Sequence, residues 1–219
     1  MKEKTTPTQR ALNLWAIILI FWSIYRVNFK LPDWFDEFIA KPLVFVLPVY
    51  WYIKRYEKVN FFSALSLKAT KIKSDIFMGF LIGGLFYLAA ILANFLKYKK
   101  FIFFNRSISD PKLITLTIII ALATGVSEEI LSRGFVLKRL YQESKNIFTS
   151  SFFASILYFF LHIPMLSTNP KITGSLLLFF MATDLVLSLI ISFIFLGGGS
   201  LILPILIHSF YNIAILLFI

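Results

Sequence analysis

The sequence predicts an all-α fold, a polytopic transmembrane helix bundle of about seven or eight spans. Of its 219 residues, 58% are hydrophobic and 26 are phenylalanine, and the mean hydropathy is +0.82. Soluble domains are only about half apolar, so this composition indicates an integral membrane protein. Because a spanning helix needs about 20 residues, the length predicts a single membrane domain over residues 1–219.

Seven apolar segments follow one another along the chain. They cover about 11–27, 38–53, 75–96, 113–132, 148–163, 174–196 and 200–219. The second is opened by Trp34 and closed by Tyr50-Trp51-Tyr52, aromatic residues of the kind found at membrane–water interfaces. The third contains Gly83-Gly84, which permits close helix approach, and Gly197-Gly198-Gly199 separates the last two. An eighth span would have to include Phe101–Phe104, which is too short to cross alone.

The formal net charge of +11 comes from basic residues between the apolar segments. Such residues follow membrane topology and anionic headgroups, so we expect contact with the lipid bilayer and no nucleic-acid partner. With the N-terminus inside, thirteen basic residues lie in cytoplasmic loops and nine in opposite loops, including those of 26–41. This favours a cytoplasmic N-terminus, and the Lys- and Phe-rich chain is typical of a bacterial plasma-membrane protein.

The stretch Ser127–Gly134 closes the fourth segment and contains Glu128, Glu129 and Arg133. An ionisable group at membrane depth costs about 2.5–3.5 kcal/mol or more, so it usually pairs, faces a cavity or has a function. On a helix, Glu129 and Arg133 lie one turn apart and can pair, whereas Glu128 points about 100° away. Helical phase therefore predicts one paired glutamate and one that is free for chemistry.

Three further groups inside the apolar segments could titrate near neutral pH: His162, His208 and Asp184. Tyr158 lies one turn before His162, and Asn212 lies one turn after His208. A glutamate with a histidine can deprotonate water, and a histidine with an asparagine can donate to an oxyanion. Together these parts support amide hydrolysis without a covalent nucleophile. The chain has no cysteine, which excludes a thiol nucleophile, a thiolate metal site and disulfides.

Asp184 belongs to neither histidine pair. It lies well inside the segment 174–196, where an unpaired carboxylate is costly. We expect a structural pairing with Lys171 or Arg133, and the alternatives are a place along a substrate cavity or nearer a membrane interface.

Three motifs that repeat a one-turn spacing occur in order: Glu128-Glu129-x-x-x-Arg133, Tyr158-x-x-x-His162 and His208-x-x-x-Asn212. The set resembles the CPBP family of membrane proteases, named for the CAAX prenyl endopeptidases and bacteriocin-processing enzymes and also called the Abi group. The resemblance covers about 113–219. The second motif departs from the family, which has Phe where this chain has Tyr158. We expect the ring to keep its packing and the added hydroxyl to find a partner.

The resemblance implies a glutamic intramembrane protease with four catalytic residues: Glu128, His162, His208 and Asn212. It implies site-orienting roles for three others: Glu129, Arg133 and Tyr158. Glutamate and histidine would activate the hydrolytic water, and the last motif would stabilise the oxyanion. Helical phase alone does not choose the active glutamate, so both stay open. The catalytic core would cover 113–219, and 1–112, with no readable chemistry, is assigned by exclusion to N-terminal scaffold helices and substrate entry.

The implied substrate is a peptide or protein near the membrane, and we expect a bacteriocin-like or signalling peptide rather than a prenylated CAAX protein. We expect no cofactor for the reaction. One alternative is a zinc enzyme with Glu128, His162 and His208 as ligands, although the chain lacks H-E-x-x-H and Asn212 is a poor zinc ligand. A second is a non-catalytic membrane immunity or regulatory binding protein. A third is a transporter, which the absence of a visible internal repeat disfavours. The sequence does not define the oligomeric state.

Overall fold

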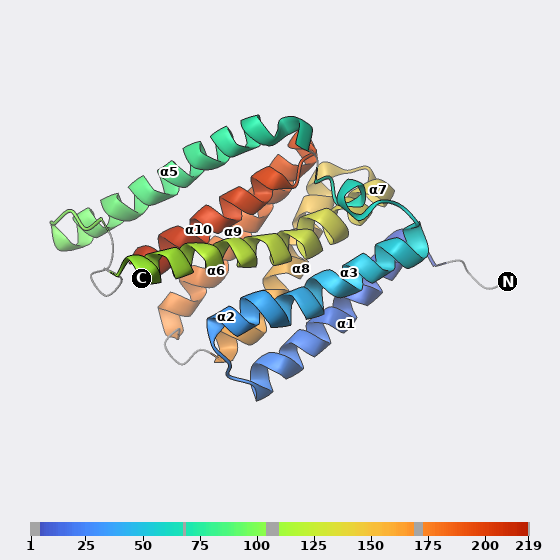
Figure 1. Cartoon of the computed structure of the whole chain (residues 1–219), viewed down its shortest axis with the longest axis horizontal. Coiled ribbons are helices and arrows are strands. Elements are labelled where there is room, and N and C mark those ends of the chain that lie inside the picture. The colour runs from blue at the N-terminus through green and yellow to red at the C-terminus, as the bar shows by residue number, and fades with distance from the viewer. Residues whose placement is uncertain (1–4, 68, 104–109, 169–172, 219) are drawn as a thin grey trace.

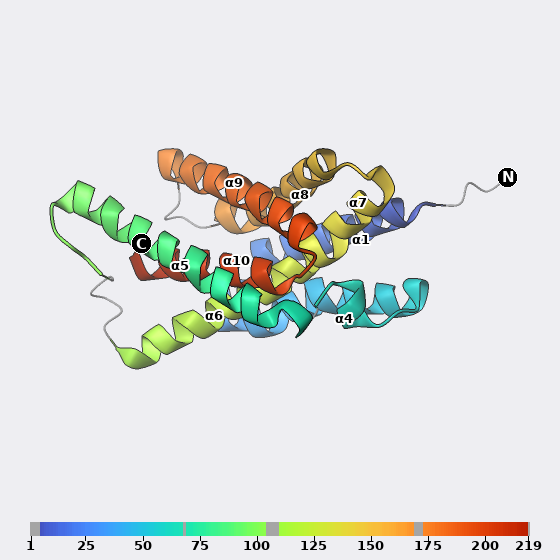
Figure 2. The ribbon, with the colours of Figure 1, turned by 90° about the horizontal axis from the view of Figure 1, so that it is seen from above.

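The computed structural model describes residues 5–67, 69–103, 110–168 and 173–218 (Figure 1). Within these ranges every regular element is a helix, which confirms the predicted all-α bundle. Figure 1 shows the start of α1 and the end of α10 on opposite sides of the molecule along its long axis. Seen from above in Figure 2, α8 and α9 lie on one side, α6 and α4 on the other, and α10 between them.

The first half of the chain forms three long helical stretches. α1 spans Pro7–Asn28, and α5 spans Ile72–Tyr98. Between them an uninterrupted run of helical turns covers α2 (Asp33–Phe35), η1 (Asp36–Ala40), η2 (Pro42–Val46), α3 (Leu47–Tyr52) and η3 (Ile53–Glu57), with η1, η2 and η3 π-helical. We call this run, residues 33–57, the second helix. The short α4 (Phe61–Ala64) and the single turn η4 (Ala69–Lys71) lead on to α5.

The second half forms four helical stretches. α6 (Pro111–Glu129) continues through the π-helical η6 (Ile130–Leu137) into α7 (Lys138–Ser144). α8 (Ile147–Thr168), α9 (Gly174–Gly198) and α10 (Ile202–Phe218) follow. Each of the seven predicted apolar segments is therefore helical.

Five of the described helices are long and apolar enough to cross a membrane: Pro7–Asn28, Ile72–Tyr98, Pro111–Ser144, Ile147–Leu166 and Gly174–Gly198. α10 is apolar but shorter, with 17 residues. Residues 101–103 form no helix, and 104–109 lie outside the described residues, so no eighth span is found in the described chain. The structure thus supports a polytopic bundle with five clear spanning candidates.

Local sequence signals fix several helix ends. Thr6 precedes α1, and its hydroxyl accepts a hydrogen bond from Gln9 N at 3.1 Å. Asp110 does the same for α6, accepting from Lys112 N at 2.9 Å. At the other end of the chain, Gly199 has φ +69° and terminates α9, which confirms the predicted break.

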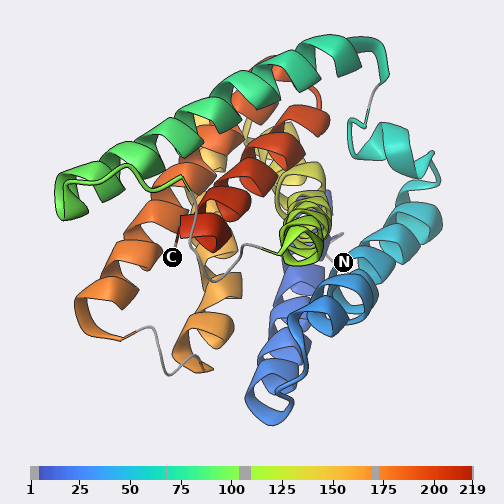
Figure 3. The ribbon, with the colours of Figure 1, turned by 60° about the vertical axis from the view of Figure 1, so that its left-hand side comes forward.

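The centre of the bundle is η6, directly after the two glutamates. All eight of its residues are buried, and they pack against α1, η2, α8 and α9. Figure 3 looks almost along α6 and shows it between α10 and the second helix. The end of α6 is therefore surrounded by helices from both halves of the chain.

Small residues let α5 approach α10 closely. A Cβ at Gly79 of α5 would lie 2.8 Å from Leu206 Cβ, and one at Gly83 would collide with the ring of Phe210. Gly84 meets nothing within 4 Å. The predicted close approach at Gly83-Gly84 is therefore correct for Gly83 only, because Gly84 points away from α10.

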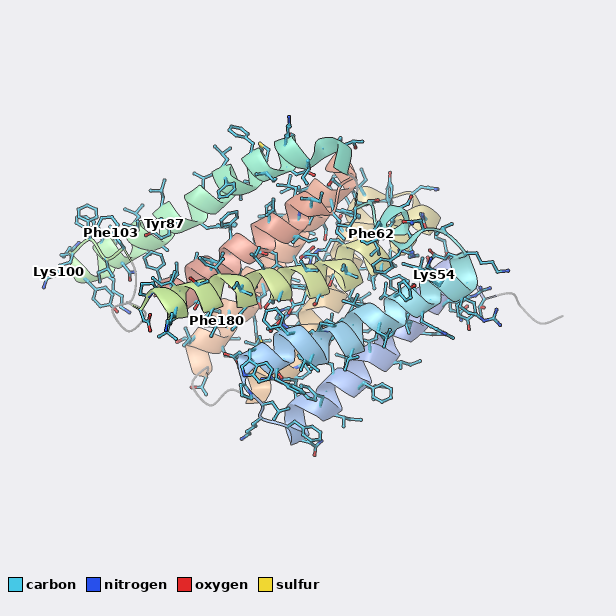
Figure 4. All side chains as sticks on the ribbon, viewed as in Figure 1. Lys54, Phe62, Tyr87, Lys100, Phe103 and Phe180 are labelled. Carbon is cyan, nitrogen blue, oxygen red and sulfur yellow. The ribbon has the colours of Figure 1, made fainter. Side chains whose placement is uncertain are left out.

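The outer surface is strongly apolar. α5 exposes a row of large side chains: Phe77, Phe80, Leu81, Leu85, Leu88, Leu92 and Leu96. Such a surface fits lipid rather than water. In the second half of α5, Tyr87 donates a hydrogen bond to the carbonyl oxygen of Phe103 at 2.7 Å, which holds the segment after α5 against the helix (Figure 4).

Candidate functional site

Three of the four predicted catalytic residues lie together in the interior, at the end of α6. Glu128, His162 and His208 come from α6, α8 and α10, and their exposed fractions are 5%, 8% and 3%. A buried carboxylate needs hydrogen-bond donors or cations around it. The contacts of Glu128 therefore define the site.

Each carboxylate oxygen of Glu128 has its own environment. Oε1 accepts a hydrogen bond from Lys41 Nζ at 2.7 Å. Oε2 accepts one from the Tyr158 hydroxyl at 2.9 Å. The Nε2 atoms of His162 and His208 lie 3.4 and 3.7 Å from the same Oε2. One oxygen thus faces a cation, and the other faces two imidazoles and a phenol.

His162 is oriented by its own helix. Its Nδ1 lies 3.2 Å from the backbone carbonyl oxygen of Tyr158, one turn earlier in α8, which leaves Nε2 directed at Glu128. The two rings pack with centroids 4.5 Å apart. The predicted contact between Tyr158 and His162 is therefore present.

The hydroxyl of Tyr158 has the partner that the sequence led us to expect. Besides Glu128, it lies 3.2 Å from His208 Nε2. The ring keeps its packing, with the Arg133 guanidinium 4.4 Å from its centroid. Tyr158 therefore links α6, α8 and α10 at the site.

Glu129 and Arg133 form the predicted one-turn pair. Arg133 Nη1 donates to Glu129 Oε1 at 2.7 Å, and both side chains are at most 1% exposed. Arg133 Nη2 also donates to the hydroxyl of Ser188 on α9 at 2.7 Å. Because each charge has a hydrogen-bonded partner, the pair can remain buried.

Both glutamates contact the same histidine. His208 Nδ1 lies 2.9 Å from Glu129 Oε1, while its Nε2 lies 3.7 Å from Glu128 Oε2. Helical phase correctly separates the two carboxylates with respect to Arg133. Both carboxylates nevertheless approach His208, because Nδ1 of its imidazole faces Glu129 and Nε2 faces Glu128.

Asn212 and Asp184 lie at the margin of this network. Asn212 is half-buried one turn after His208, and its side chain makes no hydrogen bond to the residues that the structure describes. Asp184 is half-buried on α9 and forms no ion pair with a described residue, since Arg133 bonds Glu129 and Ser188 instead. Lys171, its other predicted partner, lies outside the described residues.

Sequence reasoning missed Lys41. It lies on the second helix between η1 and η2, is 2% exposed, and donates to Glu37 Oε1 at 2.6 Å as well as to Glu128. The assignment of 26–41 to a loop was wrong at this residue, because Lys41 is inside a helix and the bundle. The spacing of Glu37 and Lys41, one turn apart at the start of an apolar segment, is the signal that could have found it.

This contact corrects two expectations. The N-terminal half, expected to hold no chemistry, supplies a side chain that contacts Glu128. Three of the counted residues, Lys41, Arg133 and Arg139, are buried and leave the loop counts. The remaining basic residues number eleven on the side of the N-terminus and eight on the other. The predicted orientation keeps its direction.

The alternative zinc set can be tested against this geometry. Among the residues that the structure describes, no group of three or more His, Cys, Asp or Glu side chains could hold a metal ion. Both oxygens of Glu128 already accept hydrogen bonds, one of them from an ammonium group at 2.7 Å that would repel a dication. The set Glu128, His162 and His208 therefore does not fit zinc as arranged here.

Comparison with protein-family models gives a match to the second half of the chain. Residues 110–214 match the family model described as Rce1-like, type II CAAX prenyl endopeptidase. These residues include α6 to α9 and most of α10, with all three motifs, but not Lys41. No curated protein and no solved structure matches the chain.

Proposed function

Through residues 110–214 the chain belongs to the Rce1-like family of type II CAAX prenyl endopeptidases, and on this premise we propose that it is an intramembrane endopeptidase. Its substrate would be a peptide or protein whose scissile bond lies near the membrane. The observation that carries the proposal is the buried Oε2 of Glu128, which faces Nε2 of His162 at 3.4 Å and of His208 at 3.7 Å.

The first step uses Glu128 and His162. A water held by Oε2 of Glu128 and Nε2 of His162 would lose a proton to this pair as its oxygen bonds to the carbonyl carbon of the substrate. The backbone contact of His162 Nδ1 fixes the direction in which Nε2 points. Because the reacting groups are pre-positioned, part of the entropy cost of bringing them together is met by the fold.

The second step uses His208 and Asn212. The carbonyl oxygen of the substrate becomes negatively charged as the water attacks, and N–H groups from the imidazole and the amide would stabilise it. When the C–N bond breaks, the proton taken from the water passes to the leaving amine. Water is thus divided between the new carboxyl and the new amino group, and no external reagent is needed.

Glu129, Arg133 and Tyr158 would orient these groups. Glu129 contacts Nδ1 of His208. Arg133 bonds Glu129 and is itself held by a second hydrogen bond to Ser188 on α9. Such supporting contacts keep the catalytic side chains in the geometry that the reaction needs.

The proposal also covers substrate, location and orientation. The substrate would be a bacteriocin-like or signalling peptide, and the protein would lie in the bacterial plasma membrane with its N-terminus in the cytoplasm.

One observation favours a second candidate, a non-catalytic immunity or regulatory binding protein. The Tyr158 hydroxyl, which the family pattern lacks, donates to the very oxygen of Glu128 that would hold the water. In a binding protein this bond would persist. In a protease, it must be exchanged for water when substrate enters.

Cleavage of a broad peptide library in liposomes, read by mass spectrometry, tests the proposal. We expect defined products from the wild type and none from Glu128→Gln. Tight binding of a peptide by well-folded wild type, without any cleavage, would favour the second candidate instead.

A further inference from the structure

We propose that Lys41 is a positioning residue for Glu128: it holds Oε1 and thereby directs Oε2 at the two histidines. The residue lies outside the part of the chain that matches the family model. The catalytic consequence rests on the proposed function, whereas the placement of Lys41 on Glu128 does not.

The geometry gives Lys41 a defined task. Its Nζ lies 2.7 Å from Oε1 of Glu128, and the Tyr158 hydroxyl and the histidines all gather at Oε2. A carboxylate can rotate about its last torsion, which is broad and roughly two-fold. A cation fixed on one oxygen removes this freedom and presents the other oxygen to the reaction.

Other cations among the described residues have different partners. Arg133 bonds Glu129 and Ser188 and lies over the ring of Tyr158. Of the Lys and Arg side chains in the described residues, Lys41 is the one that forms an ion pair with Glu128. Its loss would leave the carboxylate without a lysine or arginine partner.

Glu37 holds Lys41 in place. It lies one turn earlier on the second helix, is 9% exposed, and accepts from Nζ at 2.6 Å. The ammonium group is thus fixed between two carboxylates, Glu37 and Glu128, that come from different helices. Lys41 also lies between two π-helical stretches, η1 and η2, and such irregular turns are frequent at functional sites.

A purely structural role explains this arrangement less well. Burying an ammonium group is costly, and buried ion pairs replaced by apolar side chains of similar volume often leave stability unchanged or higher. The ring of Trp22, 5.9 Å from Nζ, and the apolar core nearby would accommodate apolar side chains in place of Lys41 and Glu37 together. A lysine at this position is therefore better explained by what it does to Glu128.

The test compares Lys41→Met, Lys41→Arg and a matched control, Arg26→Met. Arg26 pairs with Asp36 and so ties the same second helix to α1 without contacting Glu128. Steady-state cleavage by the full chain in liposomes gives kcat and KM separately. We expect Lys41→Met to lower kcat roughly 10- to 100-fold with KM changed less than about 3-fold, because general-base efficiency depends on geometry.

The two other variants separate positioning from folding. Lys41→Arg keeps the positive charge and is expected to recover most of the lost kcat, and Arg26→Met is expected to stay within about 3-fold of wild type. In the background of Glu128→Gln, adding Lys41→Met should lower the rate no further. A wild-type kcat in Lys41→Met, or an equal loss in Arg26→Met, would overturn the proposal.

Glu37→Gln serves if Lys41→Met fails to fold. It leaves Lys41 and its bond to Glu128 in place but weakens the second anchor, so kcat should fall by several-fold, less than the full loss of one charged hydrogen bond would cause. An unchanged kcat in Glu37→Gln, together with an inactive, folded Lys41→Arg, would contradict the positioning role.

A separate readout distinguishes this inference from the proposed function. If neither wild type nor Glu128→Gln cleaves any peptide, the proposed function fails, and a double-mutant cycle on thermal unfolding tests Lys41. We expect the Tm shifts of Glu37→Gln and Glu128→Gln to be non-additive, because both carboxylates share the Lys41 ammonium. Additive shifts would show that Lys41 does not couple them, and the inference would fall.

Discussion

Glu128 and Glu129 are neighbours in the chain, but their surroundings differ. Glu129 takes its cation from Arg133, four residues further on, and is 0% exposed. Glu128 takes its donors from Lys41 and Tyr158, 87 and 30 residues away, and is 5% exposed. Glu129 thus has its cation within its own helix, although His208 of α10 also contacts it, whereas Glu128 takes both its cation and its hydroxyl donor from other helices. A carboxylate whose position depends on several helices can respond when one of them moves, whereas a locally paired one serves as a fixed support.

The largest expected difference between the two glutamates is in turnover, and Glu128→Gln tests it. Glu128→Gln keeps the size of the side chain but removes its basicity, so kcat should fall roughly 10²- to 10⁴-fold. Initial rates on a reporter peptide in liposomes measure it. A Glu128→Gln variant with near wild-type kcat would remove the distinction between the two glutamates.

Glu129→Gln should act mainly on stability. It leaves the Arg133 guanidinium buried without a full counter-charge, and breaking a buried pair costs up to about 3–5 kcal/mol. We expect a clear fall in Tm, larger than that of Glu128→Gln, whose partner Lys41 keeps Glu37. Thermal unfolding in one detergent compares the two variants. Equal Tm values would contradict the assignment of Glu129 as the fixed support.

Tyr158→Phe gives a smaller effect. The change removes the hydroxyl that bonds Glu128 and lies near His208, without removing the ring. One hydrogen bond is worth about 0.5–1.5 kcal/mol, so the free energy of unfolding should fall by about this amount. If substrate must displace the hydroxyl, kcat/KM should rise by up to about tenfold. A fall of kcat/KM by a hundredfold, with the fold intact, would instead make the hydroxyl part of the chemistry.

The smallest effect expected is that of a chelator. Because the surroundings of Glu128 do not fit zinc, cleavage by wild type should be unchanged, within about twofold, after prolonged treatment with a strong chelator. The matched control is the same protein with zinc added back. Inhibition that zinc reverses would support the metal-dependent alternative and would require Lys41 to leave Glu128.

The same two glutamates illustrate how far sequence reasoning reaches. Helical spacing predicts the pair Glu129–Arg133 and the contact of Tyr158 with His162, because residues one turn apart meet on any helix. The apolar composition of the chain also predicted all seven helical segments. Neither could predict Lys41, since a contact between the second helix and α6 depends on which helices pack together.

Tyr158 lies between these cases. Because the family pattern has Phe at this position, the sequence predicted that the added hydroxyl would need a hydrogen-bond partner. It did not predict that this partner is Glu128, the candidate for activating water. Asp184 remains without an assigned role: its predicted partner Arg133 is bonded elsewhere, and Lys171 lies outside the described residues. Because an unpaired buried polar group is costly, the sequence predicts that such a group has a hydrogen-bond partner. Which residue is the partner depends on how the helices pack.

The most direct test of the central claim is to follow the oxygen of the attacking water. Wild-type protein in liposomes would cleave a reporter peptide in water labelled with heavy oxygen, with products and protein analysed by mass spectrometry at early times. We predict one labelled oxygen in the new carboxyl group and no peptide attached to the protein. A covalent peptide–protein adduct, or the absence of any product, would contradict hydrolysis by a water that Glu128 activates.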